Sequence, residues 1–459
     1  MIDPLSASAQ AVDIAAAVRG RTVSASEVVE AALRRIESAN AALNAFTAVN
    51  ADPALEKAAT VDARIAAGED PGPLAGVPFA AKSQLDIAGI TTTAGSKLLA
   101  NAPPAERDAG VVAALDVAGA ICLGALNMDE FGLGGTTENS HYGATRNPHD
   151  RSRVPGGSSG GTAAAVAAGM VPIALGTDGL GSVRLPASLC GVFGLRPSEG
   201  SVSRRGLRPA PGSLAIPGPM ARSVLDMANT FDAMRIGSAS AASCVGSLKK
   251  DVGELRVAQA VGGSYDEPFD QDVAEVIGLA AGALGITRKV EYPEPDRARA
   301  AAMLIMSAEG ATTQAADLQN RLDLFDPRTR DRFLAGAMIP ASWYLEAMKF
   351  RAWHRAAVLA LFHDVDVLLM PATPCVAPVM GTETVAVGGL QRPIGPALGY
   401  FVQPVAPTGC AAMTVPIVRP GKLPMGVQLV AALGREANLM ITARALEREG
   451  TAGSPVALA

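Results

Sequence analysis

Three segments of the 459-residue chain carry residues whose types and spacing could perform nucleophilic chemistry on a carbonyl carbon. They are the end of an apolar stretch at Lys82, the stretch Val154–Gly161 (VPGGSSGG), and the stretch Leu175–Pro186 (LGTDGLGSVRLP). A serine hydroxyl attacks a carbonyl only after a neighbouring group has taken its proton. Together the segments could supply serine nucleophiles, an amine base, and backbone N–H groups for an oxyanion.

Each segment also has an ordinary structural interpretation. A lysine at the end of an apolar strand usually extends to the surface, but burial would lower its pKa and make it a base. The GGSSGG stretch alone is typical of a flexible turn. Leu175–Pro186 has the pattern strand, glycine-rich turn, helix, which suits an oxyanion but equally suits a tight turn with a buried Asp–Arg pair. No segment decides the chemistry by itself.

The GGSSGG stretch also matches G-x-S-x-G, the pattern of a nucleophile elbow. An elbow requires a buried strand directly before the serine. Residues 147–153 (NPHDRSR) are polar and contain a proline, so they cannot form that strand. The pattern therefore does not indicate an elbow.

The order and spacing of the three segments resemble the amidase signature family. The two serines, Ser158 and Ser182, lie 24 residues apart (182 − 158), and the similarity continues through Ser188–Pro197 (SLCGVFGLRP) and over most of the chain. The resemblance implies an α/β fold with a central mixed β-sheet flanked by helices on both faces. It also implies hydrolysis of a carbonyl–nitrogen bond through an acyl-enzyme.

The resemblance further implies a Ser–cis-Ser–Lys triad. Ser182 would be the nucleophile, and Ser158, after a cis peptide bond from Gly157, would relay a proton. Lys82 would be the base and later the acid for the leaving nitrogen. The oxyanion hole would consist of four backbone N–H groups, those of Gly179, Leu180, Gly181 and Ser182.

Three more residues are expected to support this site. Asp178 and Arg184 would form a buried pair that holds the oxyanion loop in shape. Ser159 would add a hydrogen bond to the serine network.

Within the family, four stretches are most similar to 1-carboxybiuret hydrolase-like amidases: Asn127–Phe131, Thr136–Asn147, Pro371–Pro378 and Leu423–Ala431. Those enzymes have Thr-Asn in place of Gly179-Leu180 and larger aromatic residues in place of Leu133 and Gly135. The segment Pro209–Ile216 replaces a polar one. These changes remove polarity or bulk from the pocket loops, so a larger and more apolar substrate would gain room.

The sequence therefore predicts an amidase for a fairly apolar or aryl amide or carbamate (urethane). Two alternatives stay open: a hydrolase of 1-carboxybiuret, a small ureido acid, and a glutaminase-type subunit of an amidotransferase. The substrate is expected to be a small molecule. A homodimer or a small accessory subunit is compatible with the sequence.

Composition narrows the class of protein. A net charge of −5 without a basic stripe does not indicate nucleic-acid binding. Five cysteines without a CxxC pair and four histidines without ligand spacing predict no metal and no cofactor. The beginning of the chain lacks a signal-peptide pattern, and no apolar run reaches the ~18 residues of a membrane span, so we expect a cytoplasmic protein.

The elements that must position the three segments form one predicted domain, 1–459. It has a signature core at about 70–200, a helix-rich cap or insertion at about 225–365, and a C-terminal part of the core at about 366–450. A capping box, Ser24 to Glu27, predicts a helix. Short apolar strands are predicted at Ala45–Val49, Gly76–Ala80, Ala120–Ala125, Pro172–Gly176, Leu255–Val261, Val365–Met370 and Met425–Val430. Helices are predicted at Arg107–Ala118, Thr162–Ala168 and Tyr344–Leu361.

Overall fold

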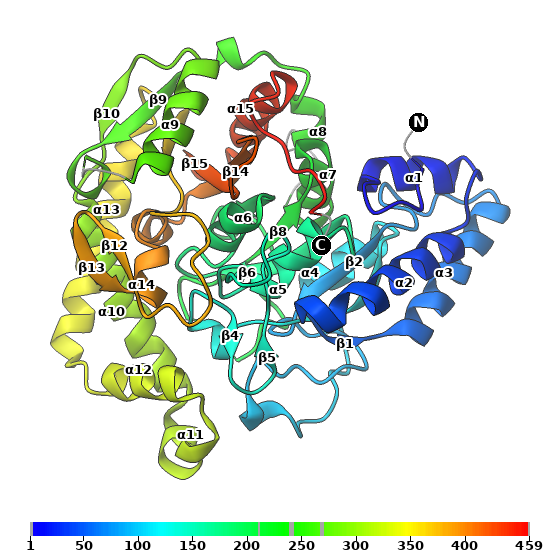
Figure 1. Ribbon diagram of the computed structural model, residues 1–459, viewed down its shortest axis with the longest axis horizontal. Coiled ribbons are helices and arrows are strands. Elements are labelled where there is room, and N and C mark those ends of the chain that lie inside the picture. The colour runs from blue at the N-terminus through cyan, green and yellow to red at the C-terminus, as the bar shows by residue number, and fades with distance from the viewer. Residues whose placement is uncertain (1–2, 210–211, 238–242, 267–269, 458–459) are drawn as a thin grey trace.

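A mixed β-sheet of eleven strands forms the centre of the residues that the computed structural model describes, 3–209, 212–237, 243–266 and 270–457 (Figure 1). In spatial order the strands are β1 (Phe46–Val49), β3 (Ile121–Leu126), β2 (Pro78–Lys82), β6 (Ile173–Asp178), β8 (Ile216–Ala221), β7 (Phe193–Arg196), β14 (Ala411–Ile417), β15 (Met425–Ala431), β11 (Val367–Pro371), β9 (Val257–Val261) and β10 (Lys289–Glu291). Two hairpins lie outside the sheet: β4 (Glu138–Asn139) with β5 (Gly143–Ala144), and β12 (Thr384–Val387) with β13 (Leu390–Pro393).

Helices cover both faces of this sheet, as predicted. On one face α7 contacts α4 and α15, and on the other α5 and α6 pack together. The helices are α1 (Ala11–Arg19), α2 (Ala25–Leu43), α3 (Ala51–Ala66), α4 (Gly110–Val117), α5 (Gly160–Ala167), α6 (Arg184–Cys190), α7 (Val224–Met234), α8 (Cys244–Ser247), α9 (Gln271–Ala283), α10 (Pro295–Thr313), α11 (Ala315–Asn320), α12 (Pro327–Ala337), α13 (Ala341–Leu361), α14 (Ile394–Leu398) and α15 (Glu436–Arg448).

Two parallel neighbours, β2 and β6, bring the first and third sequence segments together. Ala81 lies opposite Leu175 in their register. Because the strands are parallel, their carboxyl ends meet at the same edge of the sheet. Every residue of both strands is buried, including the polar residues Lys82, Thr177 and Asp178 at their carboxyl ends. The sheet edge thus places Lys82 beside the end of β6.

Local sequence signals account for several elements. The Ser24 side chain accepts a hydrogen bond from the Glu27 N–H, and the Glu27 carboxylate accepts one from the Ser24 N–H, so the predicted capping box begins α2. Strand β11 extends through Pro371, where the sequence predicts an end at Met370.

The predicted insertion at 225–365 is partly a region of sheet. Strand β9 pairs in parallel with β11 and with β10, so these two strands of the predicted insertion extend the central sheet. Helices α10 to α13 (green to yellow) gather at the opposite end of the molecule from the N-terminal helices (blue) (Figure 1). Leu180 and Leu214, from loops of the core, pack in one apolar cluster with Ala301, Ile305 and Ala347 of α10 and α13. This cluster fixes α10 over the glycine-rich loop that follows β6.

Candidate active site

Lys82, at the end of β2, is fully buried and points at two hydroxyl groups. Its Nζ donates to Ser158 Oγ at 2.8 Å and to Thr177 Oγ1 at 2.8 Å. Burial lowers the pKa of Lys82 to about 7, and the nearby negative charges of Asp129 and Asp178 only partly oppose this. A lysine with this pKa can take up a proton near neutral pH.

Ser158 lies in the turn that leads into α5, after a cis peptide bond from Gly157. The cis bond is where the sequence places it. The residues before the turn, 147–155, form turns and isolated bridges and no strand, so the structure agrees that this is no nucleophile elbow.

Ser182 lies between β6 and α6 and is half-buried. The loop of Ser182 is bonded to the Ser158 turn through Ser159, because the Ser159 N–H donates to the Ser182 carbonyl at 3.2 Å. The Ser159 Oγ also exchanges hydrogen bonds with the backbone of Thr177, at 3.2 and 3.3 Å. Ser159 therefore joins the turns of Ser158 and Ser182 to β6, which is the supporting role expected for it.

Asp178 and Arg184 form the buried pair that the sequence predicts. The carboxylate receives Arg184 Nε at 2.9 Å and Nη2 at 3.0 Å, and both side chains are inaccessible to solvent. Arg196, which was not predicted, adds a second guanidinium at 3.3 Å. These two cations hold the pKa of Asp178 well below its usual range despite its burial.

The same carboxylate shapes the glycine-rich loop and corrects one expectation. Asp178 Oδ1 accepts the Gly181 N–H at 2.7 Å, so this group is not free for an oxyanion. Within the part of the chain that the structure describes, the N–H groups of Gly179, Leu180 and Ser182 donate no hydrogen bond. These three, without Gly181, stay available as donors.

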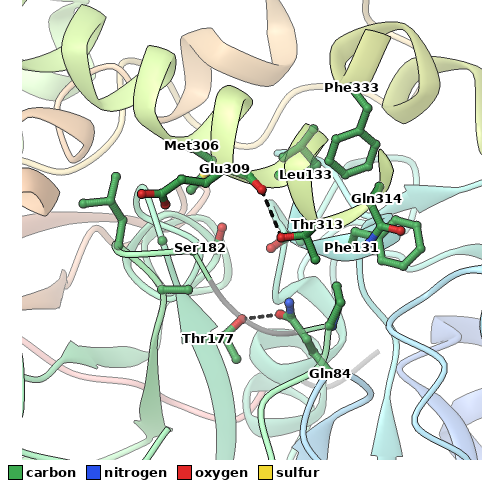
Figure 2. A pocket seen from close by; sticks show the side chains of 18 residues that line it. Gln84, Phe131, Leu133, Thr177, Ser182, Met306, Glu309, Thr313, Gln314 and Phe333 are labelled. Atoms are coloured by element: carbon green, nitrogen blue, oxygen red, sulfur yellow. Dashed lines mark hydrogen bonds between the residues drawn. The ribbon is translucent and has the colours of Figure 1, made fainter. Parts of the chain in front are cut away.

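Besides Arg196, the sequence did not predict two further residues of the site, Thr177 and Gln84. Thr177 Oγ1 accepts from Lys82 and donates to Gln84 Oε1 at 2.9 Å (Figure 2). Gln84 lies two positions after Lys82, but β2 ends at Lys82, and residues 83–84 form a turn in which the Leu85 N–H donates to the Lys82 carbonyl at 2.8 Å. Strand alternation therefore does not predict the position of Gln84. Nothing in the sequence marks Thr177 apart from its place before Asp178.

A cavity opens beside Ser182 and is lined mainly by apolar side chains. Figure 2 shows Met306, Glu309 and Thr313 of α10 on one side of it, with Thr177 and Gln84 on the other. The described lining residues are Gln84, Phe131, Gly132, Leu133, Ser158, Thr177, Gly179, Ser182, Pro209, Gly212, Leu214, Ala215, Met306, Glu309, Gly310, Thr313, Gln314 and Phe333. Ala210 and Pro211, in the segment expected to be apolar, lie outside the described residues.

The amidase family model matches residues 27–440, which span both serine turns and Lys82. The chain belongs to the amidase signature family. It is an amidase that acts on carbon–nitrogen bonds other than peptide bonds.

Three similar proteins show the range of this amidase family. The 1-carboxybiuret hydrolase subunit AtzE of Pseudomonas sp. (strain ADP) is 44% identical over 444 residues, 94% of this chain and 96% of that protein. A vestigial protein complex, solved to reveal the evolutionary origins of an s-triazine catabolic enzyme, contains a chain with 41% identity and a TM-score of 0.94 that covers 97% of this chain and 100% of its own. A bacterial aryl acylamidase is 26% identical with a TM-score of 0.87, and 96% of each chain is covered.

In the described residues, no three His, Cys, Asp or Glu side chains gather as a metal site. None of the described helices combines the length and apolar character needed to cross a membrane.

Proposed function

We propose that this amidase works through a triad in which Ser182 is the nucleophile, Ser158 the proton relay and Lys82 the base. The observation that carries the proposal is the hydrogen bond of 2.8 Å between a fully buried Lys82 Nζ and Ser158 Oγ. A neutral amine in this place can remove the hydroxyl proton of Ser158, which replaces it with the proton of Ser182.

The proposed reaction then has two halves. Ser182 Oγ bonds to the carbonyl carbon, and the oxyanion accepts hydrogen bonds from the unengaged N–H groups of Gly179, Leu180 and Ser182. Lys82 returns its proton through Ser158 to the leaving nitrogen, the carbon–nitrogen bond breaks, and an acyl-enzyme remains. Water, deprotonated through the same relay, releases the acid and restores Ser182.

We propose a neutral, fairly apolar amide or carbamate, such as an aryl amide or a urethane, as the substrate. Phe131, Leu133, Leu214, Met306 and Phe333 are the large apolar side chains that line the cavity. Apolar lining with a few polar groups suits an apolar ligand whose polar atoms are near the reacting bond.

The charges around the cavity support the same substrate class. Glu309 is the one charged side chain among its described lining residues. Arg332 lines a neighbouring space beyond Ser182, but it donates to the Leu133 carbonyl at 3.0 Å and its charge faces Asp129. An anionic substrate would therefore meet the Glu309 carboxylate in the main cavity.

A panel of substrates tests this function. We expect hydrolysis of aryl amides and aryl carbamates, and little or none of 1-carboxybiuret or glutamine. Activity on 1-carboxybiuret alone would overturn the substrate class, and ammonia release from glutamine alone would favour a glutaminase subunit.

Ser182→Ala should abolish both turnover and covalent labelling by a fluorophosphonate, with Ser152→Ala, on a surface turn, as the matched control. Labelling that persists in Ser182→Ala would refute the assignment of Ser182 as the nucleophile.

A further inference from the structure

Asp129, directly after Asn127-Met128, is a buried carboxyl beside the proposed triad that none of the proposed steps uses. Its Oδ1 accepts the Thr137 N–H at 2.9 Å, and its own N–H donates to the Ser158 carbonyl at 3.3 Å. Its Oδ2 is buried and has no hydrogen-bond partner in the described part of the structure. A buried carboxylate oxygen without a partner is rare and costly, so a compensating interaction is expected nearby.

The carboxyl fills space that only glycines leave open. A Cβ on Gly157 would lie 2.1 Å from Asp129 Oδ2, and one on Gly134 would lie 2.2 Å from Asp129 Cγ. The carboxyl is thus confined against the backbone that presents Ser158. Thr137, which holds Oδ1, also donates its hydroxyl to the Gly156 carbonyl at 2.8 Å.

The charges of Asp129 and Lys82 act on each other. Burial raises the pKa of Asp129 to about 7, and the Lys82 charge opposes the rise. The other charges that face this pair are Asp178 on the side of Lys82, and Glu138 and Arg332 on the side of Asp129. Asp178 is already neutralised by two guanidinium groups, so Asp129 is the carboxylate with charge left to offer the lysine.

We propose that Asp129 is a positioning residue of the amidase, whose unpaired Oδ2 stabilises the positive charge that Lys82 acquires when it takes the serine proton. The inference rests on the proposed triad. It assigns to Asp129 two effects: it holds the Ser158 turn in place through its backbone and Thr137, and it favours the protonated lysine during the reaction.

Asp129→Asn tests the electrostatic effect. Loss of the carboxylate should lower kcat about 10- to 100-fold with KM little changed, because a charge that forms in the reaction loses its partner. It should also move the acid limb of the kcat/KM profile about one pH unit lower, because the pKa of Lys82 falls when a nearby negative charge is removed. Glu346→Gln is the matched control, since it removes a carboxylate that forms an exposed pair with Lys349 on α13 and is not among the charges that face Asp129 or Lys82, so its profile should not move.

Two results would overturn the inference. A slower Asp129→Asn enzyme with an unmoved acid limb would leave Asp129 a purely structural role.

If Asp129→Asn does not fold, Lys82→Met provides the second measurement. Loss of the cation should raise the pKa of Asp129, so an infrared band of a protonated carboxyl should be present at pH 8 in Lys82→Met and absent from the wild type. Identical spectra would also overturn it. Full activity in Lys82→Ala would instead overturn the triad itself, which keeps the two failures apart.

Discussion

Lys82 Nζ lies 2.8 Å from Ser158 Oγ, across 76 positions of sequence. The contact joins the end of a central strand to the turn before α5, and the same amine holds Thr177 at 2.8 Å. Both partners of the lysine are neutral hydroxyl groups. A carboxylate in either place would favour the ammonium form, so this arrangement keeps the amine available as a base.

The first prediction concerns the pH dependence of the reaction. Since the pKa of Lys82 is lowered to about 7, kcat/KM should fall roughly tenfold for each pH unit below about 7 and level off above it. The sign follows from the base being active only when deprotonated. The measurement is kcat/KM for a neutral aryl amide between pH 5 and 9. A profile that stays flat down to pH 5 would contradict the role of Lys82.

The second prediction concerns Thr177. Thr177→Val keeps the shape of the side chain but removes the acceptor for Lys82 and the donor to Gln84. Loss of such a hydrogen bond is worth about 1–1.5 kcal/mol, so kcat should fall roughly tenfold. Thr177→Ser restores the hydroxyl and should keep nearly full activity. Equal activities of the two variants would show that the hydroxyl does not position the lysine.

The third prediction concerns the stability of the glycine-rich loop. Asp178→Asn leaves the buried Arg184 and Arg196 without their anion, which should lower the free energy of unfolding by about 3–5 kcal/mol. Glu346→Gln, in an exposed pair with Lys349, should change it by about 0.5 kcal/mol. Urea unfolding of both variants at pH 7 makes the comparison. Similar stabilities would mean that the network around Asp178 does not hold the fold.

The fourth prediction concerns Glu309 and substrate charge. The Glu309 carboxylate accepts from the Ser213 N–H at 2.6 Å and the Tyr344 hydroxyl at 3.1 Å, and it lines the cavity. An aryl amide that carries a carboxylate should therefore react more slowly than its methyl ester. Glu309→Gln should narrow that difference about tenfold, which corresponds to removal of about 1.4 kcal/mol of repulsion.

The control for Glu309 is Glu346→Gln, which removes a carboxylate on α13 outside this cavity. Its ratio of rates for ester and acid should match the wild type. An unchanged ratio in Glu309→Gln would show that the Glu309 carboxylate does not exclude anionic substrates.

Local patterns predicted much of the fold. Strands β2 and β6 are short apolar runs bounded by glycine or proline, and α2 begins at a capping box. Strand β8 was not predicted because Pro217 and Pro219 argue against a strand. The prolines are two residues apart, so their missing N–H groups lie on one edge. Strand β8 pairs with β6 over its full length but with β7 only at Met220 and Ala221.

The candidate site could be predicted where it depends on sequence order, as for Lys82, Ser158 and Ser182. It could not be predicted where side chains meet through tertiary packing. Asp129 lies in Asn127–Phe131, a stretch whose one signal in the sequence is its similarity to other amidases. Its contact with Gly157 depends on how two loops pack against each other. The Gly181 N–H was expected to be free, but the Asp178 side chain turns back to accept it.

Thr177 and Asp178 are adjacent on β6, yet one contacts Lys82 and Gln84 while the other binds Arg184 and Arg196. Successive side chains of a strand point to opposite sides, so this dipeptide separates proton transfer from loop support by geometry alone. A one-residue insertion in β6 would exchange the two roles and seat a carboxylate against the lysine, locking it as an ammonium ion. The phase of β6 therefore decides which side chain contacts the lysine and which one supports the glycine-rich loop.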